Sequence, residues 1–327
     1  HGKHRAHRAS HGPAGLAGAQ QLRRAGHEVT VFERDDRIGG LLRYGIPEFK
    51  MEKKVLDRRL EQMQTEGVVF KANAHIGVNV PVEELKKNFD AILLAGGACA
   101  PRDLKVPGRE LKGVHFAMEY LTQSNRRCEG DKLPADQEIT AKGKHVVIIG
   151  GGDTGADCLG TSNRQGAKSV HQLEIMPRPP EHRATTNPWP EYPHVYRVSS
   201  AHEEGVERVY SVSTKRFIGD GQGRVKALEL VKVELVHEGG RASFREIPGS
   251  EFTLPTELVL LAMGFVGPEK PGMLENLGVK LTERGNVWRD GNWMTSVSGV
   301  FTAGDMQRGQ SLIVWAIAEG RSAARGI

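Results

Sequence analysis

Cysteine is scarce in this sequence. Three cysteines occur in 327 residues, at positions 99, 128 and 158, and no two of them form a C-x-x-C pair. Their number and spacing exclude a disulfide-stabilised scaffold, a cysteine-ligated zinc or iron–sulfur site and a dithiol redox centre. We expect a protein of the reducing cytoplasm.

Long apolar runs and a dominant charge are also missing. No segment reaches the roughly 18 apolar residues that a membrane-spanning helix needs, so we expect no membrane association. The 45 basic residues are interleaved with 40 acidic ones, and aromatic residues make up only 6% of the chain. This balance argues against nucleic-acid binding. No H-E-x-x-H, EF-hand, P-loop or Ser/His/Asp pattern is present, so we predict no metal site and no catalytic side chain.

Glycine, by contrast, is abundant. The 40 glycines are about 12% of the chain, against an average near 7%. Without a collagen-like period, this excess indicates tight turns and places where the backbone approaches a ligand closely. The length predicts about two domains.

One glycine turn carries a complete dinucleotide-binding fingerprint. Gly150, Gly152 and Gly155 form G-x-G-x-x-G between a predicted strand at 145–149 and a predicted helix at 153–164. The first glycine permits the turn, the second lets a pyrophosphate approach, and the third lets helix and strand pack closely. The helix N-terminus supplies amide donors and a favourable dipole for phosphate.

The preferred nicotinamide nucleotide is left open by the residues after the next predicted strand, 169–174. Glu174 lies where an acidic residue accepts a hydrogen bond from a ribose 2′-hydroxyl, which favours NAD. Arg178 and Arg183 follow, and cations there favour the 2′-phosphate of NADP. We favour NADP, with NAD as the alternative.

A second, incomplete glycine turn lies near the N-terminus. Gly12 and Gly15 match the second and third glycines of the fingerprint, but Ser10 replaces the first. Glu33, at the end of a predicted strand at 28–32, stands where a ribose-binding carboxylate belongs, so we still predict a dinucleotide site.

The segment before this turn does not look like a strand. Residues 1–11 are polar and basic, and we expect them to be disordered or altered in sequence. His-Arg is encoded CAY-CGN, which one base later reads AYC-GNN, encoding Ile or Thr followed by Val, Ala, Gly, Asp or Glu. We therefore hypothesise a local frameshift, which resequencing of the gene would disprove by showing an intact frame.

A third turn follows a predicted strand at 300–303. Gly304 and Asp305 resemble the second half of a flavin site, where an aspartate accepts from a ligand hydroxyl. A helix beginning at Gln310 or Ser311 would direct its positive end toward the pyrimidine edge of a flavin.

The remaining pattern alternates strands and helices. It predicts a helix at 13–25, a helix at 52–66 and buried strands at 91–95 and 257–262, with a polar linker at 124–144, a proline-rich loop at 176–194 and antiparallel strands within 206–236. This alternation of strands and helices predicts an α/β fold with two Rossmann-like dinucleotide-binding domains.

Longer strings connect the chain to a known family. GGLLRYGIP (39–47), HVVIIGGGDTGADCLGTSNRQGAKSV (145–170) and GDMQRGQSLIVWAIAEGR (304–321) resemble the small (beta) subunits of glutamate synthase. The resemblance covers about 310 of the 327 residues. It implies a glutathione-reductase-like arrangement, in which an FAD domain at 1–112 and 266–327 is interrupted by an NAD(P)H domain at 113–265.

The resemblance also implies two sets of cofactor-binding residues. FAD would be held by Gly12, Pro13, Ala14, Gly15, Glu33, Arg34, Gly40, Leu41, Gly97, Gly304, Asp305, Gln310, Ser311 and Leu312. The nicotinamide nucleotide would be held by Gly150, Gly152, Asp153, Thr154, Gly155, Glu174, Arg178 and Arg183.

In such enzymes NADPH reduces FAD, and electrons pass through iron–sulfur clusters to a large subunit that makes L-glutamate from 2-oxoglutarate and glutamine. This sequence departs from the family pattern because it contains no cysteine-rich iron–sulfur domain. Two alternatives remain: a related FAD/NADPH reductase that serves another acceptor, and a flavin-free fragment that binds without catalysis.

Overall fold

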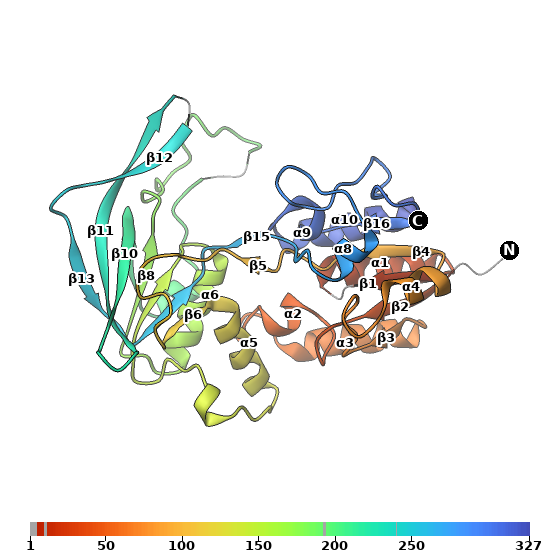
Figure 1. The fold of residues 1–327 in the computed structure, drawn as a ribbon, viewed down its shortest axis with the longest axis horizontal. Coiled ribbons are helices and arrows are strands. Elements are labelled where there is room, and N and C mark those ends of the chain that lie inside the picture. Colours follow the sequence, from red (N-terminus) through yellow and green to blue (C-terminus); the bar gives the residue numbers. More distant parts are fainter. Residues whose placement is uncertain (1–4, 10–11, 192–193, 240) are drawn as a thin grey trace. The chain divides into compact units, whose positions relative to one another are not determined.

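The computed structural model describes residues 5–9, 12–191, 194–239 and 241–327 and divides into two compact units (Figure 1). Unit 1 combines His1–Arg102 with Phe265–Ile327, and unit 2 is Asp103–Gly264. The sequence placed the first boundary ten residues later, after residue 112. In the structure, Leu104, Val106 and Leu111 pack against a core cluster of unit 2, so residues 103–112 belong to that unit.

Unit 1 is built on a five-stranded parallel sheet. Its strand order is β16-β4-β1-β2-β3, with β1 (Arg5–Ala9), β2 (Glu28–Phe32), β3 (Val69–Lys71), β4 (Ala91–Leu94) and β16 (Val300–Thr302). The helices of this unit are α1 (Pro13–Arg24), α2 (Leu41–Tyr44), α3 (Lys53–Thr65), α4 (Val82–Asn88), α8 (Met273–Leu277), α9 (Asp305–Arg308) and α10 (Ile313–Gly326).

Both faces of this sheet are covered by apolar side chains. Ile92 and Leu94 belong to one core cluster, whereas Val29 and Val31 belong to another. The neighbouring side chains alternate between faces because successive Cβ atoms of a strand point in opposite directions. Burial of each large aliphatic side chain contributes about 1.5–3 kcal/mol, so this two-sided core fixes the edge of the sheet that carries the glycine turns.

Strand β1 corrects the expectation of disorder at the N-terminus. Its main chain pairs on both sides, with Ala6 opposite Val29 of β2 and opposite Ala91 of β4. Parallel pairing to two neighbours therefore imposes an extended backbone on a sequence with little strand character. Ser10, where the fingerprint has a glycine, lies outside the described residues.

Unit 2 is also built on a five-stranded parallel sheet. Its parallel sheet has the order β6-β14-β7-β8-β9, with β6 (Val114–Phe116), β7 (His145–Ile149), β8 (Ser169–Glu174), β9 (Glu207–Tyr210) and β14 (Leu258–Leu261). The helices here are α5 (Ala117–Cys128), α6 (Asp153–Arg164) and α7 (Ser200–Glu203). The predicted fold class, α/β with two Rossmann-like halves, is confirmed.

A second sheet of unit 2 is antiparallel. It comprises β10 (Val212–Gly219), β11 (Val225–Glu238), β12 (Arg241–Glu246) and β13 (Phe252–Pro255). The prediction of antiparallel strands within 206–236 is confirmed for β10 and β11 but wrong for β9, which pairs in parallel with β8. Alternation of apolar and polar residues does not distinguish the two directions.

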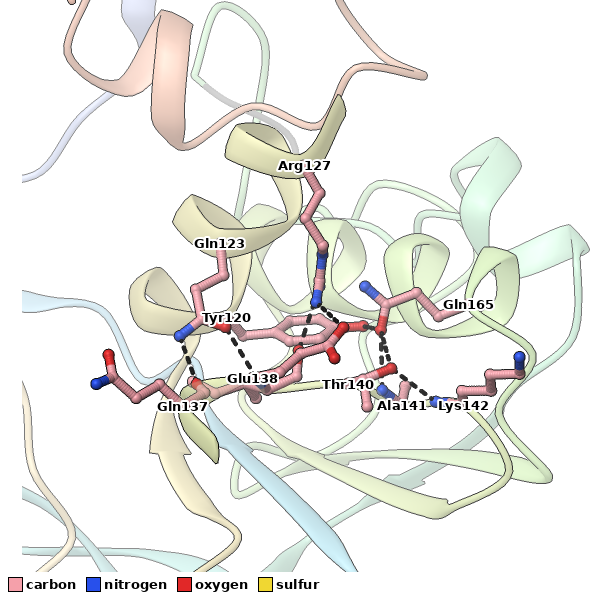
Figure 2. A network of polar contacts seen from close by, with 10 residues as sticks. Tyr120, Gln123, Arg127, Gln137, Glu138, Thr140, Ala141, Lys142 and Gln165 are labelled. Atoms are coloured by element: carbon pink, nitrogen blue, oxygen red, sulfur yellow. Dashed lines mark hydrogen bonds and ion pairs between the residues drawn. The ribbon is translucent and has the colours of Figure 1, made fainter. Parts of the chain in front are cut away.

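The predicted polar linker at 124–144 begins inside helix α5 and is then held by side chains (Figure 2). Gln165 Oε1 accepts hydrogen bonds from the Tyr120 hydroxyl at 3.0 Å and from the Ala141 amide at 2.8 Å. Gln123 donates to the Gln137 carbonyl at 3.0 Å, within the 3₁₀ turn η1 (Ala135–Gln137). These bonds replace the main-chain pairing that a linker lacks.

The chain crosses between the two units twice. The crossings are marked by β5 (Ala100–Pro101) and β15 (Phe265–Gly267), which pair antiparallel with Phe265 opposite Pro101 (Figure 1). No helix in the described part of the chain is long and apolar enough to cross a membrane.

Candidate nucleotide-binding sites

The three glycines of the complete fingerprint meet three different surroundings in unit 2. Gly150 has a φ of +131°, and a Cβ there would lie 2.2 Å from the Ala262 carbonyl oxygen. A Cβ on Gly155 would lie 2.3 Å from the Gly150 carbonyl oxygen. Gly152, the N-cap of α6, has no atom within 4 Å of an added Cβ. The first and third glycines therefore serve packing, and the second faces open space.

The first turn of α6 follows this space directly. Asp153 and Thr154 are its first two residues, as the sequence predicted, and Gly152 has no side chain that could cap the helix. The amides at the start of α6 lack helical partners, because the first four N–H groups of any helix do. A phosphate is the kind of group that such amides bind.

Glu174 is directed back onto the glycine turn. Its Oε2 accepts from the Gly151 amide at 2.9 Å, and its Oε1 accepts from the Met176 amide at 3.1 Å. Both carboxylate oxygens therefore hold the main chain of their own site. That Glu174 also accepts a hydrogen bond from a ribose hydroxyl remains a prediction.

The two arginines after β8 differ in their surroundings. Arg183 donates to the Asn187 and Glu191 carbonyls, both at 3.0 Å, and so braces the proline-rich loop. Arg178 is exposed, pairs with Glu181 at 2.5 Å and lies over the Tyr196 ring at 4.2 Å.

Arg208, which no motif singled out, also lies over Tyr196, at 4.7 Å from the ring centroid. Together Arg178, Arg208 and Tyr196 form a positively charged cluster with an aromatic centre. The three residues are far apart in sequence, so only the folded chain shows that they lie together.

The incomplete glycine turn of unit 1 has the same local construction. Gly12 is the N-cap of α1 with Pro13 at the first helical position, and an added Cβ at Gly12 has no atom within 4 Å. Ala14 and Gly15 are buried. A Cβ on Gly320 of α10 would lie 2.1 Å from the Ala14 carbonyl oxygen, so helices α1 and α10 pack backbone to backbone here.

Glu33 ends β2 as predicted, but its side chain is fully buried. Its Oε1 accepts from the Asp35 amide at 2.7 Å. The neighbouring Arg34 pairs with Glu269 at 2.6 Å. Contacts of Glu33 and Arg34 with a bound ribose or adenine remain predictions.

Two further glycines hold sharp turns near these residues. Gly97, after β4, has a φ of +74°, and Gly40, the N-cap of α2, has a φ of +53°. Cys99 donates its thiol to the Gly96 carbonyl at 3.2 Å, and burial raises the pKa of this thiol. Cys99 is therefore protonated near neutral pH.

The turn after β16 joins Gly304, Asp305 and the start of α10. Asp305 Oδ1 accepts from the Ser311 hydroxyl at 2.8 Å, and burial raises the pKa of the Asp305 carboxyl. Gln310 Oε1 accepts from the Phe265 amide at 2.8 Å. Helix α10 begins at Ile313, with Leu312 as its N-cap, two or three residues later than predicted.

Glu319 stabilises this turn through hydrogen bonds and was not predicted from the sequence. Its side chain is buried and accepts from the Gly304 amide at 2.9 Å, from Gln307 Nε2 at 2.6 Å and from Arg308 Nε at 2.5 Å. The signal available in the sequence was an acidic residue on the apolar face of α10, between Ala316 and Ala323.

Apolar side chains are exposed beside these turns. Val314 is 61% exposed, Trp315 49% and Leu41 48%, and Leu312 and Ile313 are also exposed. Consecutive exposed apolar residues at the start of a helix are unusual for a solvent-facing surface. Across the described residues, no group of three His, Cys, Asp or Glu side chains is arranged to hold a metal ion.

Comparison with known proteins agrees with this geometry. A family model described as pyridine nucleotide-disulphide oxidoreductase matches residues 11–320. The glutamate synthase [NADPH] small chain of Mycobacterium tuberculosis is 63% identical over 97% of this chain, which spans 64% of that protein. A putative glutamate synthase [NADPH] small chain of Cereibacter sphaeroides is 41% identical, with 97% of this chain and 74% of that protein covered.

Solved structures show the same fold. FprA of Mycobacterium tuberculosis in complex with NADPH superimposes with a TM-score of 0.75 at 18% identity, covering 99% of this chain and 84% of that chain. The expected resemblance is confirmed. The chain belongs to the pyridine nucleotide-disulphide oxidoreductase family and, within it, to the glutamate synthase small chains.

Proposed function

We propose that this chain takes hydride from NADPH onto FAD, with NADPH held by unit 2 and FAD held by unit 1. The main support is that Gly152 and Gly12 are the N-caps of equivalent helices, and that an added Cβ at either has no heavy atom within 4 Å. Each therefore leaves room for a phosphate at a helix N-terminus. Bound together, the two cofactors supply both hydride donor and hydride acceptor, so no side-chain base is required.

The residues of unit 1 fit a flavin. The exposed apolar side chains of residues 312–315 offer a surface that an aromatic ring system would cover. Helix α10 directs its N-terminus toward the same region, where partial positive charge favours a ring that gains electrons. The buried Glu319 holds the Gly304–Asp305 turn in place, so the turn is formed before any ligand arrives.

The residues of unit 2 fit NADPH better than NADH. Glu174 accepts from two main-chain amides, so its carboxylate has a structural role that does not require NADH. Arg178 and Arg208 place two guanidinium groups over Tyr196. Guanidinium groups form bidentate hydrogen bonds with phosphate, and NADPH carries a 2′-phosphate that NADH lacks.

The electrons would serve glutamate synthesis. The relatives are named glutamate synthase [NADPH] small chains, which supports a large subunit as partner, with 2-oxoglutarate and glutamine as its substrates and L-glutamate as product. We place this reaction in the cytoplasm. A related reductase with a different acceptor and a flavin-free binding fragment are the competing proposals.

A visible spectrum tests the proposal directly. We would purify the chain with FAD, remove oxygen and record the spectrum before and after addition of NADPH. Loss of the flavin absorbance is the expected result. A colourless protein would contradict FAD binding and favour the flavin-free alternative, and a flavin that NADPH leaves oxidised would contradict hydride transfer.

A further inference from the structure

A buried glutamine lies under the glycine turn of unit 2. Gln172, on β8, is 2% exposed, and its Nε2 donates to the Gly150 carbonyl at 3.0 Å. A Cβ on Gly155 would lie 2.6 Å from the same nitrogen. The glutamine amide therefore fills the space that the third glycine leaves between helix and sheet.

Gln172 and Glu174 clamp one peptide group from both ends. The Gly150 carbonyl accepts from Gln172, and the Gly151 amide, the other end of the same planar peptide, donates to Glu174 at 2.9 Å. Residues two apart on a strand share a face, so a single strand supplies both contacts. The orientation of this peptide sets the direction of the chain as it enters the turn.

His202 orients the glutamine. Its Nε2 lies 3.0 Å from Gln172 Oε1, and its Nδ1 accepts from the Ser199 amide at 3.0 Å. Because Nδ1 accepts, the proton of the neutral imidazole is on Nε2, which donates to Gln172 Oε1. The glutamine then has its NH₂ group toward Gly150, as a carbonyl requires.

The chain of contacts continues from His202 to the N-cap of α7. Ser199 is the N-cap of α7, and its hydroxyl lies 2.7 Å from His202 Nδ1. The link therefore runs from the Ser199 amide through His202 and Gln172 to the Gly150 carbonyl. It joins the segment that carries Arg178 and Tyr196 to the turn at the start of α6.

We propose that His202 and Gln172 are positioning residues for the nicotinamide nucleotide, which preset the glycine turn for the pyrophosphate. Neither residue touches the reacting atoms, so they act on nucleotide affinity and leave the hydride step unchanged. This inference rests on the proposed NADPH site of unit 2.

Two substitutions of His202 separate the link from the helix cap. In His202→Gln the amide nitrogen takes the place of Nε2 and still donates to Gln172, but the acceptor for Ser199 is lost. In His202→Asn the amide oxygen takes the place of Nδ1 and still accepts from Ser199, but the contact with Gln172 is lost. Gln172→Met keeps the volume and removes both hydrogen bonds of the glutamine.

We would measure the Kd of NADP⁺ by calorimetry on the FAD-loaded chain, together with KM for NADPH and kcat in turnover with ferricyanide as the electron acceptor. We expect His202→Gln to bind within about twofold of wild type, and His202→Asn and Gln172→Met to bind about tenfold more weakly, the effect of losing one or two buried hydrogen bonds. KM should rise in step with Kd, and kcat and FAD content should stay unchanged.

The opposite order overturns the inference. If His202→Asn binds NADP⁺ like wild type and His202→Gln does not, His202 serves only the cap of α7. If the His202 variants do not fold, unchanged binding by Gln172→Met is sufficient to reject the role. Wild-type protein that binds no NADP⁺ would instead reject the proposed function of unit 2, so the two failures are distinguishable.

Discussion

Alanine substitutions at Gly152 and Gly155 are predicted to fail in different ways. Gly152 has φ and ψ of −84° and −172°, which alanine adopts readily, and an added Cβ contacts nothing. Alanine caps a helix less well than glycine, by about 0.5–1 kcal/mol. It also restricts the unfolded chain, which stabilises the protein by about 0.4–1 kcal/mol. The two effects nearly cancel, so Gly152→Ala should leave the free energy of unfolding almost unchanged.

Nucleotide affinity should nevertheless fall in Gly152→Ala. The new methyl group occupies the space at the N-terminus of α6 that a phosphate must enter. We expect the Kd of NADP⁺ to rise at least tenfold, or about 1.4 kcal/mol. Gly155→Ala has the reverse problem, because its Cβ would lie 2.3 Å from a main-chain oxygen. Overpacking of this kind costs about 1–3 kcal/mol of stability.

The assay pairs thermal unfolding, followed by circular dichroism, with calorimetric titration of NADP⁺. Gly12→Ala is the matched control, because it places the same methyl group at the N-cap of α1 and should leave NADP⁺ binding intact. The reasoning is refuted if Gly152→Ala binds NADP⁺ as wild type does. Equal losses of stability in Gly152→Ala and Gly155→Ala would refute it as well.

Three further predictions concern Glu319, Asp305 and the cysteines. Glu319→Ala leaves three hydrogen-bond donors, of which Arg308 is half-exposed, without their buried acceptor. The free energy of unfolding, measured by urea titration, should fall by about 3 kcal/mol. A loss below about 0.5 kcal/mol would contradict the role of the carboxylate. Because burial raises the pKa of Asp305, the folded state binds its proton more tightly, and the stability from this group falls as pH rises through the folded-state pKa. Asp305→Asn should therefore raise Tm of the FAD-free chain at pH 7, with the gain disappearing below the ordinary pKa of 3.8, and a gain that persists at lower pH would oppose this explanation. Iodoacetamide at pH 8 should modify the exposed Cys128 well before Cys99, whose pKa burial raises, and peptide mass spectrometry that finds equal rates would show that Cys99 is accessible.

Elements with local signals were predictable from the sequence. The strand at 145–149, the helix at 153–164 and the strand at 169–174 have the predicted bounds. Each is bounded by glycines or by a change of periodicity, which act within a few residues. The resemblance supplied the order of the two units, which periodicity alone does not contain.

Elements that depend on distant partners were not predictable in the same way. Strand β1 is extended because β2 and β4 flank it, and its own residues favour no strand. Strand β9 runs parallel to β8, with Gln172 opposite Arg208, and the sequence of β9 alone does not indicate this direction. The end of helix α5 was interpreted as a linker because its exposed face is polar, although Leu121 and Asn125 on the other face are buried.

In the candidate sites, too, residues with a local sequence signal were predictable and residues that act through tertiary contacts were not. The glycines could be predicted because their spacing in sequence is the signal. Glu174 was predicted as a ribose-binding carboxylate, which stays a prediction, and its contact with the Gly151 amide is a property of the folded turn. Gln172, His202 and Glu319 act through tertiary contacts, and a single sequence contains no spacing that joins them to the turns they hold.

The paired segments β5 and β15 have a consequence for how the chain can come apart. Phe265 lies opposite Pro101, so the points at which the chain leaves unit 1 and returns to it are neighbours. They are about 5 Å apart, as in any paired strands. While unit 2 is folded its ends are held together and add little loop-closure entropy, whereas an unfolded unit 2 is a long loop that unit 1 must close, so unit 1 is more stable with unit 2 folded. Each unit has its own core and can melt on its own, and a single unfolding midpoint for the whole chain would then average two separate transitions.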